Sequence, residues 1–178
     1  MRAWLAILPL LACEEARRPP AVAAEAAAAP APVPPGDLAL CEAVRDSAPE
    51  RCGDEACRER YEILRVLFKT MLSAPRCSIG SKDFQAICNA ATDRKLWECQ
   101  KVALRLRPLC DALASADGAA CHPGGGRECV DLFQAAAGVS RGDFAAIDRV
   151  RDPALRVAAK ATLGRIDCAE ELRRALGP

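Results

Sequence analysis

Histidine, aromatic residues and excess charge of either sign are all scarce in this sequence. One histidine in 178 residues excludes most histidine-based catalysis and most mixed Cys/His metal sites. Aromatic residues make up 4% of the chain, so a core must consist mainly of Ala, Leu, Val and Cys. The 25 basic and 24 acidic residues nearly cancel, which gives no support to a nucleic-acid-binding surface or a polyacidic tail. We therefore expect no nucleic-acid partner.

Motifs that would carry catalytic or metal chemistry are also missing. No CxxC pair occurs, whereas zinc sites and thioredoxin-like redox enzymes use closely spaced cysteine pairs. The stretch HPGGGRE after Cys121 lacks the Lys-Ser/Thr of a phosphate-binding loop and follows no predicted strand. We interpret His122 within it as an exposed turn residue. The chain is not expected to be an enzyme, and we predict no catalytic residue, metal or cofactor.

The N-terminus carries the first clear signal. After Met1-Arg2, residues 3–12 form an apolar run too short to span a bilayer, which needs roughly 20 residues, but suited to a signal peptide. The run ends in Leu10-Leu11-Ala12-Cys13. Here the chain resembles a bacterial lipoprotein precursor, whose lipobox places small residues before an invariant cysteine. The resemblance implies a signal peptide over residues 1–12 and a lipidated Cys13 that anchors the protein in a membrane.

An Ala/Pro-rich linker follows the lipidated cysteine, over residues 13–36. Its composition cannot bury a core and favours extended polyproline II structure, so we expect a disordered tether. Among lipoproteins the residue after the cysteine contributes to sorting. Glu14 differs from the Asp associated with inner-membrane retention, which implies an exported protein in the bacterial outer membrane. The membrane face stays open.

Residues 37–178 show helical periodicity nearly throughout. Apolar positions from Cys57 to Met71 follow alternating spacings of four and three, and a similar series runs from Leu96 to Leu113, where Pro108 must kink or restart the helix. No alternating β-branched run appears. We predict an all-α domain, a small disulfide-stapled bundle of antiparallel helices. The predicted helix caps and stops are Asp37, Ser81, Gly138, Ser140 with Asp143, Asp152-Pro153, and Asp167 with Glu170.

The chain holds 11 cysteines, and ten remain once Cys13 is set aside. We predict that these ten form five disulfides. They are Cys41, Cys52, Cys57, Cys77, Cys88, Cys99, Cys110, Cys121, Cys129 and Cys168.

A helical hairpin is our hypothesis for the central cysteines. If the chain reverses near Asp93, Cys88 lies opposite Cys99 and Cys77 opposite Cys110. Cys121 and Cys129 bracket a glycine-rich loop that can close on itself, and any bond of Cys168 must tie the C-terminal helices to the earlier body.

Location and scaffold are clearer from the sequence than activity. We expect a binding or scaffolding component of a bacterial cell-envelope assembly, such as a secretion, motility or surface apparatus, with a protein partner in the envelope. Two other classes stay open. One is a secreted or periplasmic helical inhibitor or immunity-type protein, and the other is a thiol-disulfide redox protein.

Overall fold

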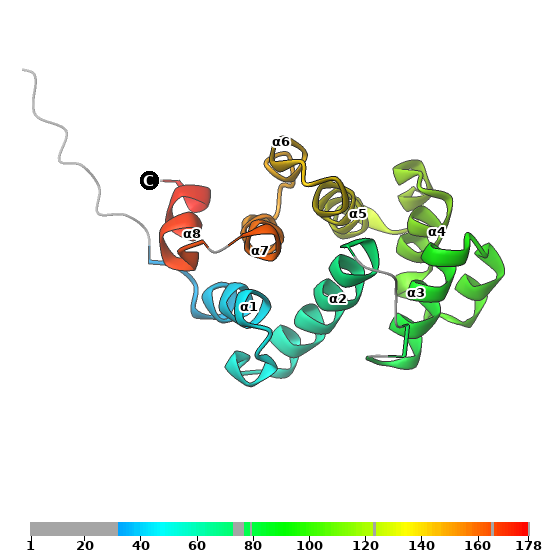
Figure 1. The fold of residues 1–178 in the computed structure, drawn as a ribbon, viewed down its shortest axis with the longest axis horizontal. Helices are drawn as coiled ribbons and strands as arrows, with labels where there is room; N and C mark the ends of the chain where they lie inside the picture. The colour runs from blue at the N-terminus through cyan, green and yellow to red at the C-terminus, as the bar shows by residue number, and fades with distance from the viewer. Residues whose placement is uncertain (1–31, 73–76, 79, 123, 165, 178) are drawn as a thin grey trace, which may run out of the picture.

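The computed structural model describes residues 32–72, 77–78, 80–122, 124–164 and 166–177, and all regular structure within them is helical (Figure 1). The predicted all-α fold is confirmed. The signal peptide, Cys13 and most of the predicted linker lie outside the described residues. In chain order the elements are α1 Pro35–Asp46, η1 Pro49–Arg51, α2 Glu55–Leu72, α3 Lys82–Asp93, η2 Leu96–Lys101, η3 Leu104–Leu106, α4 Arg107–Ser115, η4 Gly118–Cys121, α5 Gly126–Arg141, α6 Phe144–Ile147, α7 Pro153–Leu163 and α8 Cys168–Leu176, where η marks a 3₁₀ helix.

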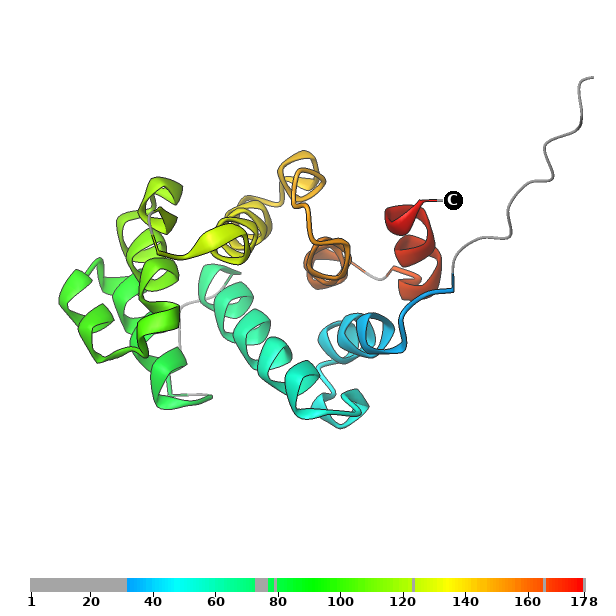
Figure 2. The same ribbon diagram turned by 180° about the vertical axis from the view of Figure 1, so that it is seen from behind.

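Two groups of helices are joined by a middle pair. At one end α1 packs against α7 and α8, so the first and last helices lie together (Figures 1 and 2). At the other end α3 packs against α4 and η2. Helices α2 and α5 pack against each other between the groups, and each also contacts both ends. The arrangement buries every long helix on one face.

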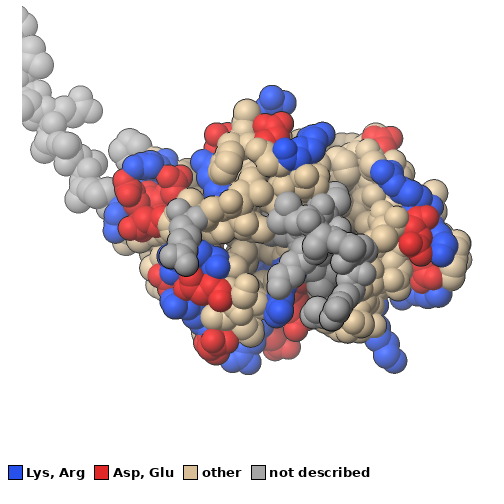
Figure 3. All heavy atoms as spheres, in the orientation of Figure 1, with Lys and Arg blue, Asp and Glu red and all other residues tan. Residues whose placement is uncertain are grey.

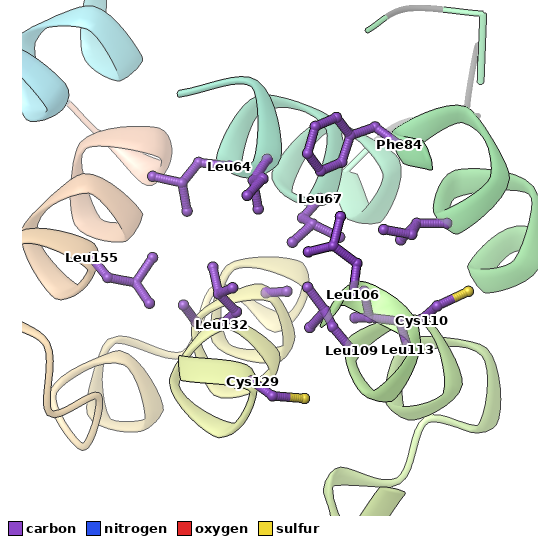
Figure 4. Close-up of a cluster of buried hydrophobic side chains, with 14 of the residues drawn as sticks. Leu64, Leu67, Phe84, Leu106, Leu109, Cys110, Leu113, Cys129, Leu132 and Leu155 are labelled. Atoms are coloured by element: carbon purple, nitrogen blue, oxygen red, sulfur yellow. The ribbon is translucent and has the colours of Figure 1, made fainter. Parts of the chain in front are cut away.

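Leucine side chains fill the centre of the molecule. Figure 4 shows Leu64 and Leu67 of α2, Leu132 of α5 and Leu109 of α4 pointing toward one another from different helices. Their exposed fractions are at most 7%. Helix α2 buries the predicted face, since Cys57, Tyr61 and Leu64 are all in the core, while the side chains of Phe68 and Met71 lie outside the described part. The core is aliphatic, as the shortage of aromatic residues predicts.

A smaller apolar cluster holds the two ends of the domain together. Its buried members come from α1, α7 and α8 and are Cys41, Val157, Ala161, Cys168 and Leu172. Arg156 of α7 adds polar contacts, because its guanidinium donates to the backbone oxygen of Ala175 at 3.1 Å and to that of Val150 at 3.2 Å. The C-terminal helix is therefore part of the folded body.

Several helix starts follow the predicted caps. The Ser81 hydroxyl accepts from the Phe84 amide, and the carboxylates of Asp152 and Asp167 each accept from an amide three residues on. Pro153 occupies the first turn of α7. These local signals are confirmed.

Three predicted boundaries are wrong. Helix α1 begins at Pro35 with Pro34 as its N-cap, so Asp37 lies in the first turn and caps nothing through its side chain. Gly138 does not stop α5, which continues to Arg141 and ends at Gly142 with φ of 64°. Ser140 is inside α5, where its hydroxyl donates to the Ala137 oxygen at 2.9 Å, so the predicted box with Asp143 does not form. Asp143 itself is the N-cap of α6, and its carboxylate accepts from the Ala146 amide at 3.0 Å.

Gly138 has a packing role instead. A Cβ at this position would lie 2.7 Å from Cγ1 of Ile147, so only glycine allows α6 to fold back this closely onto α5. Ile147 is fully buried there. Glycine is therefore required at position 138 for the packing of α6 against α5, and not for ending α5.

The series from Leu96 to Leu113 is not one kinked helix. It forms η2, η3 and then α4, with Pro108 in the first turn of α4, so the chain restarts there as predicted. The Asp83 carboxylate accepts from the Ala103 amide at 3.2 Å, and the Arg107 guanidinium donates to the Val102 and Gln100 oxygens. These contacts satisfy backbone groups that an α-helix would pair internally.

Candidate functional site

All ten cysteines after position 13 are paired in the structure. The five disulfides are Cys41–Cys168, Cys52–Cys57, Cys77–Cys88, Cys99–Cys110 and Cys121–Cys129. Four of them have both partners buried, and in the remaining one Cys77 is partly exposed while Cys88 is 2% exposed. The framework is a set of internal staples.

The predicted hairpin pairing is wrong. Cys88 bonds to Cys77 and not to Cys99, and Cys110 bonds to Cys99 and not to Cys77. The hairpin required a continuous helix from residue 96 onward, whereas η2 turns Cys99 back onto α4, 5.6 Å from Cys110 between Cα atoms. Helices α3 and α4 still pack together, but no disulfide joins them. One disulfide links α3 to the segment before it, and the other links η2 to α4.

The other two cysteine expectations agree with the structure. Cys121 pairs with Cys129 and closes the glycine-rich loop, and Cys168 pairs with Cys41 over a separation of 127 residues. The second bond ties α8 to α1 within the smaller apolar cluster. It is the longest-range covalent link in the described chain.

The loop closed by Cys121–Cys129 packs closely against Pro108 of α4. A Cβ at Gly125 would lie 2.6 Å from Cβ of Cys129 and 2.8 Å from Cβ of Pro108, so this position admits only glycine. His122 is exposed, as interpreted from the sequence, and its amide donates to the Ala119 oxygen at 3.0 Å. The loop therefore holds the start of α5 against α4.

A groove of about 430 Å³ opens beside this loop. One wall is the first half of α5 and the other is the segment between α6 and α7. Its lining residues are His122, Gly126, Arg127, Val130, Asp131, Gln134, Arg149 and Arg151. We call it the arginine groove. Sequence reasoning missed it because the arginines come from two distant segments, and neither segment is basic enough to stand out.

Asp131 forms the floor between the two walls. It is the single charged residue among the buried described residues, at 7% exposed. One carboxylate oxygen accepts from the Arg151 amide at 3.2 Å and the other from the Asp152 amide at 3.3 Å. The side chain thus fixes the 150–152 segment to α5 at the point where α7 begins.

A second hollow, also lined by Asp131, is small. It measures about 30 Å³, enough for about one or two water molecules, and lies among α2, α5 and α7. Arg60 of α2 pairs there with Asp152 at 2.5 Å. Burial raises the pKa of the nearby Asp37 carboxyl, and the charge of Arg60 opposes that rise. We interpret this hollow as a structural junction of three helices.

Charged side chains of both signs are otherwise interspersed. Figure 3 shows Lys, Arg, Asp and Glu mixed over the visible face, in keeping with the neutral composition. No helix within the described ranges is long and apolar enough to cross a membrane. Those ranges also contain no cluster of three or more His, Cys, Asp and Glu placed to hold a metal ion.

Comparison of the chain with protein-family models, with curated proteins and with solved structures found no match. The residues themselves therefore carry the functional argument.

Proposed function

We propose that this chain is an exported lipoprotein, anchored in the bacterial outer membrane through Cys13. Its helical domain would act as a binding or scaffolding component of a cell-envelope assembly. One observation carries the proposal. The five disulfides use ten of the 11 cysteines, and the cysteine left over is Cys13, where the lipobox resemblance places the lipidated residue.

The disulfides also support export on independent grounds. Structural disulfides form in oxidising compartments outside the cytosol. Ten cysteines within pairing geometry in one small domain suit such a compartment, and the support comes from the helical body rather than from the N-terminal segment. Two unrelated parts of the chain therefore favour the same location.

Burial of the sulfurs favours a scaffold over a redox protein. Thiol–disulfide exchange requires access to a sulfur atom, and nine of the ten paired cysteines are buried. We therefore propose no enzymatic function for the disulfides. A soluble inhibitor or immunity-type protein would share the same staples but lack the lipid.

Metabolic labelling with a palmitate analogue tests the anchor. We expect label on the wild-type chain expressed in a bacterium that processes lipoproteins, none on C13A, and a larger precursor when globomycin blocks lipoprotein signal peptidase. The matched control is C52A/C57A, which removes two cysteines and one disulfide but retains Cys13, and so should stay labelled. An unlabelled wild-type chain with no precursor would overturn the proposal and favour the soluble alternative.

Fractionation and thiol counting test the remaining parts. The labelled protein should sediment with outer-membrane rather than inner-membrane fractions. Protein purified without reductant and then denatured should show no free thiol among the ten cysteines of the helical domain. A reproducible pair of reactive thiols would instead support the redox alternative.

A further inference from the structure

We propose that the arginine groove binds a phosphomonoester group, carried either by a small soluble molecule or by a lipid headgroup. The proposal concerns the folded domain and does not depend on the lipid anchor. It rests on the groove's shape, on three arginines without carboxylate partners and on the way the backbone directs them to one place.

The backbone brings the arginines together from opposite walls. On α5, the lining residues Gly126, Arg127, Val130 and Gln134 follow helical spacing along one face. On the other wall Val150 is fully buried, and its two neighbours Arg149 and Arg151 are exposed and line the groove. Insertion of Val150 into the core thus places both flanking guanidinium groups beside α5.

None of these three arginines forms an ion pair within the described part of the chain. By contrast Arg45, Arg51, Arg60, Arg105 and Arg174 each contact a carboxylate. The acidic residue next to Arg149 is also engaged, because Asp148 pairs with Lys160 of α7 at 2.7 Å. The groove therefore holds three guanidinium groups that form no ion pair with a carboxylate of the described residues.

Asp131 cancels only part of this charge. Both of its oxygens accept backbone amides, so the carboxylate is committed to the floor. Three arginines against one aspartate leave a local charge of +2, counted from the arginine and aspartate residues of the lining. Helix α5 begins at Gly126 on the groove's edge, and the positive end of its dipole adds to the same field.

The donors suit phosphate better than a carboxylate. A guanidinium donates two parallel hydrogen bonds to a phosphate or carboxylate, so three of them require more than the two oxygens of a carboxylate. A phosphomonoester offers three terminal oxygens and close to two negative charges. The volume of about 430 Å³ exceeds that of the phosphate alone and leaves room for the attached group.

Titration calorimetry with the full chain in detergent tests binding. The probes are inorganic phosphate, glycerol 3-phosphate and acetate, with acetate as the carboxylate control. We expect glycerol 3-phosphate to bind and acetate, added in competition, not to displace it. The R149Q/R151Q variant should bind glycerol 3-phosphate about tenfold or more weakly than the wild type does. The matched control R141Q/R173Q removes the same charge from exposed arginines outside the groove and should bind as the wild type does.

Vesicle flotation distinguishes the two sources of the phosphate. Phosphatidylcholine vesicles with and without phosphatidic acid are compared, so that membrane insertion of the N-terminal segment contributes equally to both. Extra binding to phosphatidic acid that R149Q/R151Q abolishes supports a lipid ligand, and binding to glycerol 3-phosphate alone supports a soluble one.

Three results would overturn the proposal. They are wild-type protein that binds neither glycerol 3-phosphate nor phosphatidic acid vesicles, acetate that binds as well as glycerol 3-phosphate, and equal losses of binding in R149Q/R151Q and R141Q/R173Q. Since all four substitutions are at exposed positions, the melting temperature should stay close to that of the wild type. If either double variant unfolds, R127Q provides the same test from the α5 wall. Palmitate labelling reports on Cys13 alone, so failure of either proposal is recognisable by itself.

Discussion

The Cys41–Cys168 disulfide should contribute far more stability than the Cys52–Cys57 disulfide. The first closes a loop over a separation of 127 residues and the second over five. In the chain-entropy model the stabilisation grows with the logarithm of loop length, giving about 5 kcal/mol for the long loop and about 2 kcal/mol for the short one. The expected difference is about 3 kcal/mol.

Two double-alanine variants isolate this difference. All four cysteines are buried, at 0–6% exposed, so C41A/C168A and C52A/C57A remove similar amounts of packed surface. Urea unfolding followed by far-ultraviolet circular dichroism measures the free energy of unfolding, with each variant compared with the wild type. The difference corresponds to roughly 10 °C in melting temperature for a domain of this size.

Equal destabilisation of the two variants would refute the reasoning, and so would a larger loss in C52A/C57A. Either result would mean that the disulfides act through native packing and not through the unfolded chain. A changed denaturant slope in C41A/C168A alone would be consistent with the argument, because the unfolded chain would then expose more surface.

Three further predictions concern single positions. Asp131→Ala should lower the free energy of unfolding by about 1–3 kcal/mol, since two partly buried amides lose their acceptor, and Asp131→Asn should lose less. Gly125→Ala should cost about 1–3 kcal/mol through overlap with Cys129, whereas at Gly124 a Cβ meets only ordinary contact at 3.5 Å and should be near neutral. The amide of Glu170 lowers the pKa of Asp167 below its usual 3.8, so the stabilisation by this cap is complete above pH 4 and is lost as the pH falls through the folded-state pKa.

Matched measurements check these three. Urea unfolding of the Asp131 and Gly125 variants against their controls should give the stated order, and equal losses within either pair would contradict it. For Asp167, melting temperatures between pH 7 and pH 2 should fall less steeply in D167N, because asparagine still caps α8 but does not titrate. Identical slopes would show that other carboxylates account for the acid sensitivity.

Local features of this fold were predictable from the sequence. The side chains of Asp152 and Ser81 accept hydrogen bonds from backbone amides only three residues further along the chain. Their capping roles therefore depend little on the rest of the fold. The helical face from Cys57 to Leu64 is similarly local. The role of Gly138 was not predictable, because it depends on Ile147 approaching from another helix.

The cysteine pairing shows a different limit. Spacings of 11 residues fit a bond across a hairpin and a bond along the chain equally well. The choice depends on whether residues 96–106 form α-helix or 3₁₀ turns, and that depends on Arg107 and Asp83 reaching distant backbone groups. The arginine groove was missed for the same kind of reason, because it exists only once Arg127 and Arg149 are brought together in space.

The bond between Cys41 and Cys168 also determines how the domain carries mechanical load. A pull applied to the chain before Cys41 and after Cys168 is transmitted through the sulfur atoms, so the 127-residue path between them bears almost none of it. Helices α2 to α7 lie inside that closed path and cannot be drawn out end to end while the bond is intact. Under tension, only the segments outside the ring can lengthen.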